Sequence, residues 1–522
     1  MNKAGSRGAA FLVGAGILLS RIAGLVRNKV FAYYFGSSLA ADALNAAIRI
    51  PNLLQNLFGE GVLSASFIPE YAGLLAQGRK QESDKLAGVI AASLALTSAV
   101  VVLAGVLAAP LLVSLIAGGF TGERRDLTVQ LTRILFPGAG LLVLSAWCLG
   151  ILNSHRKFFV SYTAPVIWNV AMIGALLGFG RGTPQVRLAE IVAWASVVGS
   201  ALQFGIQLPL VFSLARGLRL NFDVNTQSAR GVFRNFLPAF VSRGVVQISA
   251  YIDALIASWL PTGAVAVFAY AQVLYTLPVS LFGMAVSAAE LPVMSSATGT
   301  PGEIASYLRG RLDGGLERIA FFIVPSVVAF LALGDVISAV LFESGRFTRA
   351  DSIWVWQILA GSTIGLLAST WGRLYSSTFY ALRDTRTPLR FALVRVVLTT
   401  ALGYLAALKL PGWLGVDPKV GVAGLTASAG IAGWVEFYLL RRALAQRIGP
   451  TGTAASFTLR LWGAALVSAA VAWGAKLGLS GAHTVINALL ILTAYGMSFL
   501  LLATLLRIPE ATALASRLRR GR

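Results

Sequence analysis

The sequence predicts an all-α polytopic membrane protein, in which fourteen transmembrane helices form two pseudo-symmetric six-helix lobes around a central cavity, followed by two extra C-terminal helices. Composition is the first reason, because 57% of the 522 residues are hydrophobic and only 12% are charged, with a mean hydropathy of +0.75. Soluble proteins are far more polar. The apolar residues also gather in stretches of about 20, the length of a membrane-spanning helix. Segments of the first half recur in the second half, which indicates a duplicated bundle.

The expected spans are separated by loops that carry charged, glycine or proline residues, in the order 9–35, 39–66, 87–117, 128–152, 158–179, 188–214, 233–259, 264–295, 315–341, 353–380, 388–408, 420–444, 457–478 and 484–506. The net charge is +22, and most of the 43 Lys and Arg residues fall in loops that are cytoplasmic if the N-terminus is cytoplasmic. The positive-inside rule therefore selects this orientation, and an even number of spans returns the C-terminus to the cytoplasm. We expect the basic tail to rest against anionic lipid headgroups and to bind no nucleic acid. Its residues are Arg517, Arg519, Arg520 and Arg522.

The first expected helix, 9–35, begins like a signal peptide, because a basic start precedes an apolar run. It lacks a small-residue cleavage site and continues into a segment that contains arginines, so we expect it to be retained as a helix. Arg21 and Arg27 lie within about a third of the helix circumference, together with Ser20 and Asn28. One face of this helix is therefore cationic.

The second expected helix carries a polar stripe of six residues, spaced three or four apart: Asp42, Asn45, Arg49, Asn52, Asn56 and Glu60. At about 100° per residue they fall in one sector roughly 80° wide. A charge that faces hydrocarbon costs roughly 2.5 to 3.5 kcal/mol even on lenient insertion scales. The stripe therefore predicts a wet cavity or a dense polar helix contact, to which the first two helices both bring cations.

An internal repeat supports the two lobes. Leu57-Phe58-Gly59 before Pro69 is echoed by Leu281-Phe282-Gly283 before Pro292, and Phe120-Thr121 is echoed by Phe347-Thr348. Each copy spans six helices, so the copies have the same orientation and are related by an axis along the membrane normal. We expect an N-terminal lobe at 1–220, a C-terminal lobe at 221–448, and helices 13 and 14 with the basic cytoplasmic tail at 449–522.

Catalytic and metal-binding motifs are absent from the sequence. It contains no phosphate-binding P-loop, no H-E-x-x-H, no G-x-S-x-G and no paired-aspartate motif, and no soluble domain interrupts the spans. The single Cys148 and the distant His155 and His483 provide no metal ligand set. We therefore expect a transporter rather than an enzyme, with no cofactor and no metal.

Several segments now carry a resemblance to a known family. They are Ser20-Arg21-Ile22-Ala23-Gly24-Leu25-Val26-Arg27, Phe35-Gly36, Asp42-Ala43, Arg49-Ile50-Pro51-Asn52-Leu53-Leu54 and Phe58-Gly59-Glu60-Gly61, followed by Ser64, Phe67 and Pro69. Later segments agree, namely Gly345-Arg346-Phe347-Thr348 and Phe379-Tyr380-Ala381 through Arg383-Asp384-Thr385-Arg386-Thr387-Pro388. The chain resembles the MurJ (MviN) family of lipid II flippases in peptidoglycan synthesis, within the superfamily that includes multidrug and polysaccharide exporters. The first 70 residues are the specific part of the match.

The resemblance implies that the protein flips an undecaprenyl-diphosphate-linked disaccharide pentapeptide outward across the bacterial inner membrane by alternating access, with a role in cell-wall biogenesis and cell shape. It implies arginines that grip the diphosphate and a groove for the lipid tail in the last two helices. The substrate-binding residues that we expect are Arg21, Arg27, Asp42, Arg49, Asn52, Glu60 and Arg243. The expected partners are the lipid-linked diphosphate glycan, membrane lipids and cell-wall synthesis proteins. Guanidinium groups suit a diphosphate, because they bind its oxygens two at a time.

The chain also departs from the family pattern. The family usually has an acid where this chain has Asn28, and a basic residue where it has Gln55. Helix 8 typically carries an Asp-Arg pair, whereas this chain has Gln272 and Val273. Arg243 on helix 7 is a candidate substitute for the missing arginine.

Energy coupling is the second departure. Some members of the family build a sodium site from an acid on helix 7 and two ligands on helix 11. Asp253 matches the acid, but Thr399 and Gly403 stand at the other two positions. We therefore expect Arg395, one turn before Thr399, to pair with Asp253 in place of sodium.

Each candidate also has a structural interpretation. Arg21 and Arg27 can form ion pairs with acids of the second helix that only lock the two helices together. Glu60 can have a structural role at a helix end, and Arg243 can form an ion pair with Glu290 or cap a loop. Three alternative functions also stay open: a flippase for another polyprenyl-linked saccharide, a cation-coupled multidrug antiporter of the same superfamily, and a scaffold without transport activity. The antiporter would need an acidic cavity, whereas the first two helices carry more cations than acids.

Overall fold

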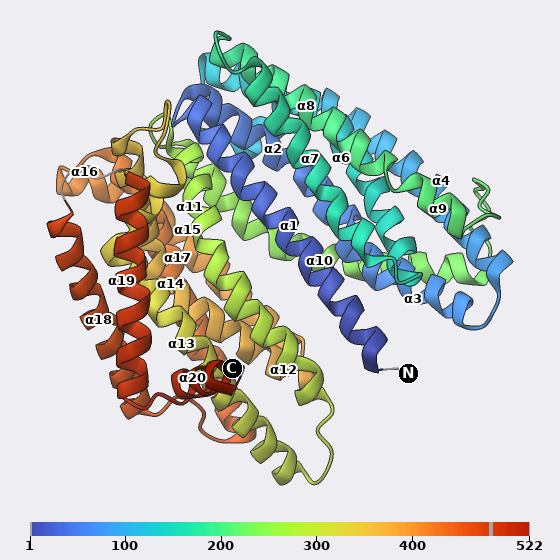
Figure 1. The fold of residues 1–522 in the computed structure, drawn as a ribbon. Helices are drawn as coiled ribbons and strands as arrows, with labels where there is room; N and C mark the ends of the chain where they lie inside the picture. The colour runs from blue at the N-terminus through green and yellow to red at the C-terminus, as the bar shows by residue number, and fades with distance from the viewer. Residues whose placement is uncertain (1–2, 480–483, 521–522) are drawn as a thin grey trace. The chain divides into compact units, whose positions relative to one another are not determined.

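The computed structural model describes residues 3–479 and 484–520. Their secondary structure is helical, with one isolated β-bridge between Ser344 and Phe347. The chain divides into two compact units (Figure 1): Met1–Ala266 with Ser344–Phe347, and Val267–Glu343 with Thr348–Arg522. The all-α fold class predicted from composition is confirmed.

The first unit contains α1 (Lys3–Phe35), α2 (Leu39–Phe58), α3 (Glu60–Ala76), α4 (Lys80–Leu107), α5 (Ala109–Ile116), α6 (Gly122–Ser154), α7 (Phe158–Phe179), α8 (Gln185–Gly205), α9 (Leu208–Leu214) and α10 (Gln227–Ser258). Figure 1 shows α1, in blue, alongside α7, and these two helices pack together. α2 packs against α6, and α10 packs mainly against α3. A buried cluster that includes Phe67, Tyr71 and Trp147 forms the core between α3, α4 and α6.

The second unit contains most of α11 (Ala264–Pro278), the π-helix η1 (Val279–Met284), α12 (Ala285–Ser295), α13 (Pro301–Phe342), α14 (Arg349–Ala381), α15 (Arg386–Tyr404), η2 (Leu405–Lys409), α16 (Leu410–Leu414), η3 (Pro418–Val420), α17 (Gly421–Ile448), α18 (Ala455–Gly478), α19 (Thr484–Leu505) and α20 (Pro509–Arg520). α14 packs against α17 and α13, and α18 pairs with α19. α20 contains Arg517, Arg519 and Arg520 of the basic tail. The side chains of Arg517, Arg519 and Arg520, and all of Arg522, lie outside the described residues.

Eleven helical segments of the described chain are long and apolar enough to cross a membrane. This confirms a multi-pass membrane protein. The three remaining expected spans correspond to α1, to α2 with α3, and to α10. These segments carry the cations and amides expected in the site, and such residues lower the hydropathy of a helix. The total of fourteen therefore stays a prediction.

The second expected span, 39–66, is two helices rather than one. α2 ends and α3 begins on either side of Gly59, whose φ of −86° and ψ of −147° are not helical. A Cβ atom at this position would lie 2.1 Å from the carbonyl oxygen of Gln55, so no other residue fits without a shift. The break separates Glu60 from the polar stripe, because the stripe ends with α2.

The second copy of the Leu-Phe-Gly motif also lies at a helix irregularity. Gly283 is within η1, where the helix widens to a π-helix. Its Cβ would lie 2.6 Å from Cγ2 of Thr370 on α14. π-helical turns occur mostly as interruptions of α-helices and are common at functional sites. In both copies of the repeated motif, the glycine therefore lies where the regular α-helix is interrupted.

The compact units differ from the expected lobes at one helix. α10 was expected to begin the second lobe at 221, but it packs with the first unit, which extends to Ala266. Sequence symmetry and side-chain packing are different criteria, since a helix can belong to one repeat and pack against the other. The symmetric lobes 1–220 and 221–448 stay a prediction.

Candidate substrate-binding site

Arg27 is the cation of α1 whose surroundings are best defined. Its Cζ lies 4.8 Å from the ring centroid of Trp168 on α7, and its Nη2 donates to Oδ1 of Asn28 at 3.1 Å. Trp168 is held in turn from α8, because its Nε1 donates to Oγ of Ser196 at 3.0 Å. A guanidinium over an indole face is favourable and fixes the plane of the charged group. Three helices therefore determine where the Arg27 charge lies, whereas Arg21 is exposed on α1.

Exposure along α2 increases from its first turn to its last. Asp42 is fully buried, Arg49 and Asn52 are half-buried, and Asn56 is exposed. Asn45, also half-buried, donates from Nδ2 to the carbonyl oxygen of Ala41 at 2.8 Å. The accessible part of the stripe is therefore its second half.

The carboxylate of Asp42 forms hydrogen bonds with other residues of the protein. It accepts hydrogen bonds from the backbone N–H groups of Gly263 at 2.7 Å and Ala266 at 2.8 Å, and from Nη1 of Arg124 at 3.3 Å. The Arg124 guanidinium also lies 4.1 Å from the ring centroid of Phe120. With 0% of its surface exposed, this carboxylate has the surroundings of a structural group. The acid that was expected in the cavity connects α2 to the beginning of α11 and to α6.

Arg49 is tied to α10. The hydroxyl of Tyr251 donates to the backbone carbonyl oxygen of Arg49 at 2.9 Å. The carboxylate of Asp253 lies close enough for its charge to act on the Arg49 guanidinium. The structure thus places Arg49 of α2 and Asp253 of α10 near each other within the first unit.

Two expected site residues are only partly described. Glu60 is the first residue of α3, and Arg243 lies within α10, but both side chains fall outside the described part of the structure. Their predicted roles stay predictions. The alternative partner considered for Arg243, the carboxylate of Glu290, is engaged in the second unit by Arg311 and Arg318.

Arg395 has a carboxylate partner that was not singled out from the sequence. Its Nη1 lies 3.1 Å from Oε2 of Glu436, which connects α15 to α17. The expected pairing of Arg395 with Asp253 concerns two different units and stays a prediction. Thr399 and Gly403 are buried on α15.

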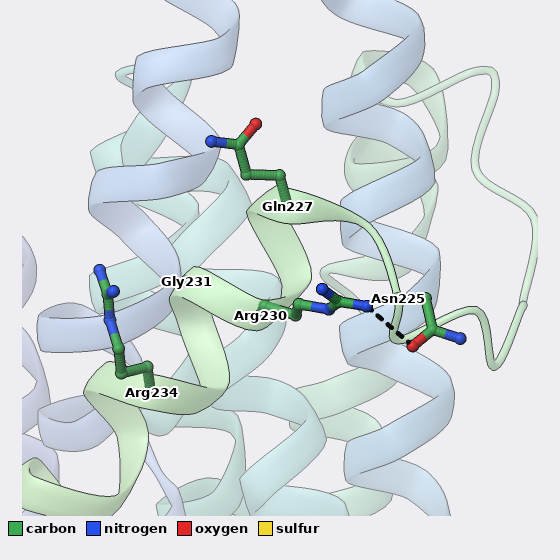
Figure 2. Close-up of a pocket in the computed structure, with 5 residues that line it drawn as sticks. All are labelled: Asn225, Gln227, Arg230, Gly231 and Arg234. Atoms are coloured by element: carbon green, nitrogen blue, oxygen red, sulfur yellow. Dashed lines mark hydrogen bonds between the residues drawn. The ribbon is translucent and has the colours of Figure 1, made fainter.

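A pocket of about 320 Å³ opens at the beginning of α10, lined by Asn225, Gln227, Arg230, Gly231 and Arg234. Figure 2 shows that its two arginines do not converge. Arg230 reaches Asn225, with Nη2 donating to Oδ1 at 3.3 Å, whereas Arg234 points to the other side of the helix. Both arginines are exposed. The pocket is therefore a basic surface at a helix end and lacks the converging donors of an anion site.

Sequence reasoning missed the residues that fix the charged side chains of the site and their immediate partners, namely Trp168, Ser196, Arg124 and Tyr251. Each is far along the chain from the residue it contacts, and none is marked by a distinctive local pattern. Within the described residues, no three His, Cys, Asp or Glu side chains are placed to hold a metal ion.

The fold defines the class of protein: a polytopic helical membrane protein, with cationic faces on helices of its first unit. A solved multidrug resistance MATE family transporter of the MOP superfamily, in an inward-facing conformation, matches with a TM-score of 0.64 at 19% identity. The match covers 82% of this chain and 95% of that chain. A solved lipid II flippase MurJ in an inward closed conformation matches with a TM-score of 0.77 at 24% identity, covering 95% and 98%.

The sequence matches are more specific. The family model for lipid II flippase MurJ matches residues 31–495. The lipid II flippase MurJ of Burkholderia cenocepacia is 32% identical over 461 residues, which are 87% of this chain and 86% of that protein. A protein named probable lipid II flippase MurJ from Rhizobium tropici is 32% identical over 434 residues, 81% of this chain and 78% of that protein. The chain therefore belongs to the lipid II flippase MurJ family.

Proposed function

We propose that this transporter flips lipid II, a polyprenyl-diphosphate-linked peptidoglycan precursor, from the cytoplasmic to the outer leaflet of the bacterial inner membrane by alternating access. Family membership along most of the chain carries this proposal. The positive-inside pattern supports an orientation with both termini in the cytoplasm. Membrane lipids and the lipid-linked glycan are the proposed partners, with cell-wall synthesis proteins as candidate protein partners.

The proposed substrate-binding residues are Arg21, Arg27, Arg49, Asn52, Glu60 and Arg243. The chemistry of a diphosphate supports the arginines among them, because its charge must be compensated wherever water is partly excluded. The ring of Trp168 holds the guanidinium of Arg27 in a fixed plane before any ligand arrives. A pre-positioned donor loses less conformational freedom on binding than a mobile one. We assign Asp42 to the protein framework instead, since its buried carboxylate already accepts three hydrogen bonds.

Asp253 has a proposed role beside Arg49. A half-buried cation without a ligand needs a compensating charge, and Asp253 is close enough to provide one. When a diphosphate binds, it competes with Asp253 for the same guanidinium. In this proposal Arg49 exchanges an internal anion for the substrate anion, and no sodium ion is required at Asp253.

A strain depleted of its own lipid II flippase tests the proposal. The wild-type chain should restore growth, whereas Arg27→Ala and Arg49→Ala should each fail while the protein still inserts in the membrane. Arg187→Ala is the matched control, because Arg187 is 69% exposed and pairs with Glu190 on the same helix. Normal rescue by both Arg27→Ala and Arg49→Ala would contradict the cationic site.

A flippase for another polyprenyl-linked saccharide is the second candidate. Val273 of α11 favours this candidate, because the family usually has an arginine at this position. Identification of the lipid-linked intermediate that accumulates in the cytoplasmic leaflet after depletion in the native host separates the two candidates. If Arg243 replaces the missing cation, Val273→Arg should restore the activity that Arg243→Gln loses.

A further inference from the structure

Three side chains of the second unit form a compact ionic cluster that the proposed function does not use. Glu290 of α12 is 2% exposed, and its Oε2 lies 2.9 Å from Nε and 2.6 Å from Nη2 of Arg311 on α13. Its Oε1 lies 3.1 Å from Nη1 of Arg318, which is about two helical turns further along α13. Arg311 is 35% exposed and Arg318 is 47% exposed. One buried carboxylate therefore orients two accessible guanidinium groups, and the cluster has one positive charge in excess.

The two guanidinium groups present further donors on one side of α13. Arg311 and Arg318 are seven residues apart, so they project within about 20° of each other. Glu290 engages Nε and Nη2 of Arg311 and Nη1 of Arg318. Within the described residues, Nη1 of Arg311 and Nη2 of Arg318 remain for an outside acceptor. The neighbouring acid Glu317 is turned about 120° from Arg311 and so does not face the same ligand.

An aromatic pair borders the cluster on the same face. Phe322, one turn after Arg318, stacks on Phe282 of η1 with a centroid distance of 4.3 Å and an interplanar angle of 3°. Phe322 is 38% exposed, which is unusual for a large apolar ring inside a helical bundle but ordinary at a membrane interface. The π-helical turn of η1 brings Phe282 to this position.

The length of α13 places the cluster at the depth of lipid headgroups. The helix has 42 residues and is therefore about 63 Å long, roughly twice the hydrocarbon thickness of about 30 Å. Residues 319–334 contain no charged side chain, and Arg318 is the last charge before this run. Arg318 therefore lies where hydrocarbon gives way to headgroups, with Arg311 about 10 Å further out along the helix.

We propose that Arg311 and Arg318, oriented by Glu290 and bordered by Phe282 and Phe322, bind the phosphate of a membrane lipid. Guanidinium forks match phosphate oxygens, and a lipid places its phosphate at this depth with an apolar chain beside the aromatic pair. The phosphate can belong to a polyprenyl diphosphate or to an anionic phospholipid. The site requires only a lipid phosphate, so it does not depend on the proposed flipping of lipid II.

Photo-crosslinking of the purified full-length protein tests the site. The probes are phosphatidylglycerol and undecaprenyl diphosphate that carry a photoreactive group, and peptide mapping locates the attached lipid. We expect at least one probe to label peptides within 279–322. Arg318→Gln should weaken that labelling about tenfold, the effect of one lost charge-assisted hydrogen bond. Competition by each unlabelled lipid identifies which source of phosphate the site prefers.

Arg442→Gln is the matched control, because Arg442 is exposed on α17 and outside the cluster. Arg318→Gln leaves Glu290 with both contacts to Arg311, so its melting temperature should match that of the wild type. If it unfolds, Arg318→Lys keeps the charge and should label at an intermediate level. Equal labelling of wild type and Arg318→Gln, competition by diacylglycerol as strong as by phosphatidylglycerol, or no labelling by either probe would each overturn the proposal.

Discussion

Arg27 lies over a ring that a third helix holds in place. A cation–π contact of this kind contributes ~0.5–2 kcal/mol. Trp168→Leu removes the face on which the guanidinium rests, so the flipping rate of lipid II in proteoliposomes should fall by about 2 to 30-fold. Trp194→Leu on α8 is the matched control, because Trp194 is 56% exposed. An unchanged rate in Trp168→Leu would show that Arg27 needs no such support.

Asp42 provides a second test at single residues. Asp42→Asn keeps one acceptor for the N–H groups of Gly263 and Ala266 but loses the charge that faces Arg124. We expect a loss of stability of about 1–3 kcal/mol, because a buried group loses its charged partner. The melting temperature of the purified variant measures this. Asp223→Asn, in an exposed pair with Lys85, should change it far less. A normal melting temperature with lost transport would instead place Asp42 in substrate binding.

Residue types in the site were predictable, but their partners were not. The spacing of the stripe on α2 shows that polar side chains share one face, and this follows from helix geometry alone. Whether Asp42 meets water, substrate or another helix depends on Arg124 and Gly263, which are 82 and 221 residues away. No local pattern carries that information.

At the scale of elements, the break between α2 and α3 depends on one glycine. Gly59→Ala places a Cβ against the backbone of Gln55, so the last turn of α2 must shift and the melting temperature should fall by several degrees. Gly73→Ala in α3 is the control, since a Cβ there meets nothing within 4 Å. That change should be neutral or stabilising by up to ~1 kcal/mol. Equal effects of the two substitutions would argue against a required break.

The turn before α15 gives a pH-dependent test. Asp384 accepts hydrogen bonds from the backbone N–H and the hydroxyl of Thr387, and from Nη2 of Arg447. These bonds, led by the Thr387 N–H, lower the pKa of Asp384 from 3.8 to about 2. The folded state therefore favours the ionised form, and this stabilisation is present above pH 3.8 and is lost as the pH falls toward 2.

Asp384→Asn should accordingly lower the melting temperature at neutral pH. The difference from the wild type should shrink between pH 3.8 and pH 2, as both chains then carry an uncharged group at this position. The effect is small because Asp384 is near solvent. A difference that is constant across this range would contradict the role of the ionised carboxylate.

Most helices could be predicted from hydropathy, but their interruptions could not. Long apolar runs such as those of α13 and α14 follow from the length that a bilayer requires. The π-helical turn at Gly283 lies within a continuous apolar segment, where a hydropathy profile shows no boundary, and the polar stretch before Gly59 was equally compatible with one continuous helix. The turn at Gly283 packs closely against Thr370 of α14, which is a tertiary contact, whereas the break at Gly59 lies in the conformation of its own backbone beside the carbonyl oxygen of Gln55.

At the scale of the whole molecule, composition predicts the class of protein but not the compact unit to which each helix belongs. The multi-pass helical class follows from apolar content and is confirmed by eleven apolar segments. The assignment of α10 did not follow from the repeat, because the contacts of this helix with α3 decide its unit. The helices that fall short of the hydropathy of a typical span are those that carry the proposed site.

The flipping of fluorescent lipid II in proteoliposomes under an imposed membrane potential, without sodium, tests the proposed transport most directly. The wild-type protein should move lipid II between leaflets, driven by a potential worth about 2.3 kcal/mol per charge per 100 mV. Arg27→Gln and Arg49→Gln should each lower the rate at least about tenfold, and Arg187→Gln should not. Wild-type rates in both site variants, strict dependence on sodium, or no movement of lipid II by the wild-type protein would contradict it.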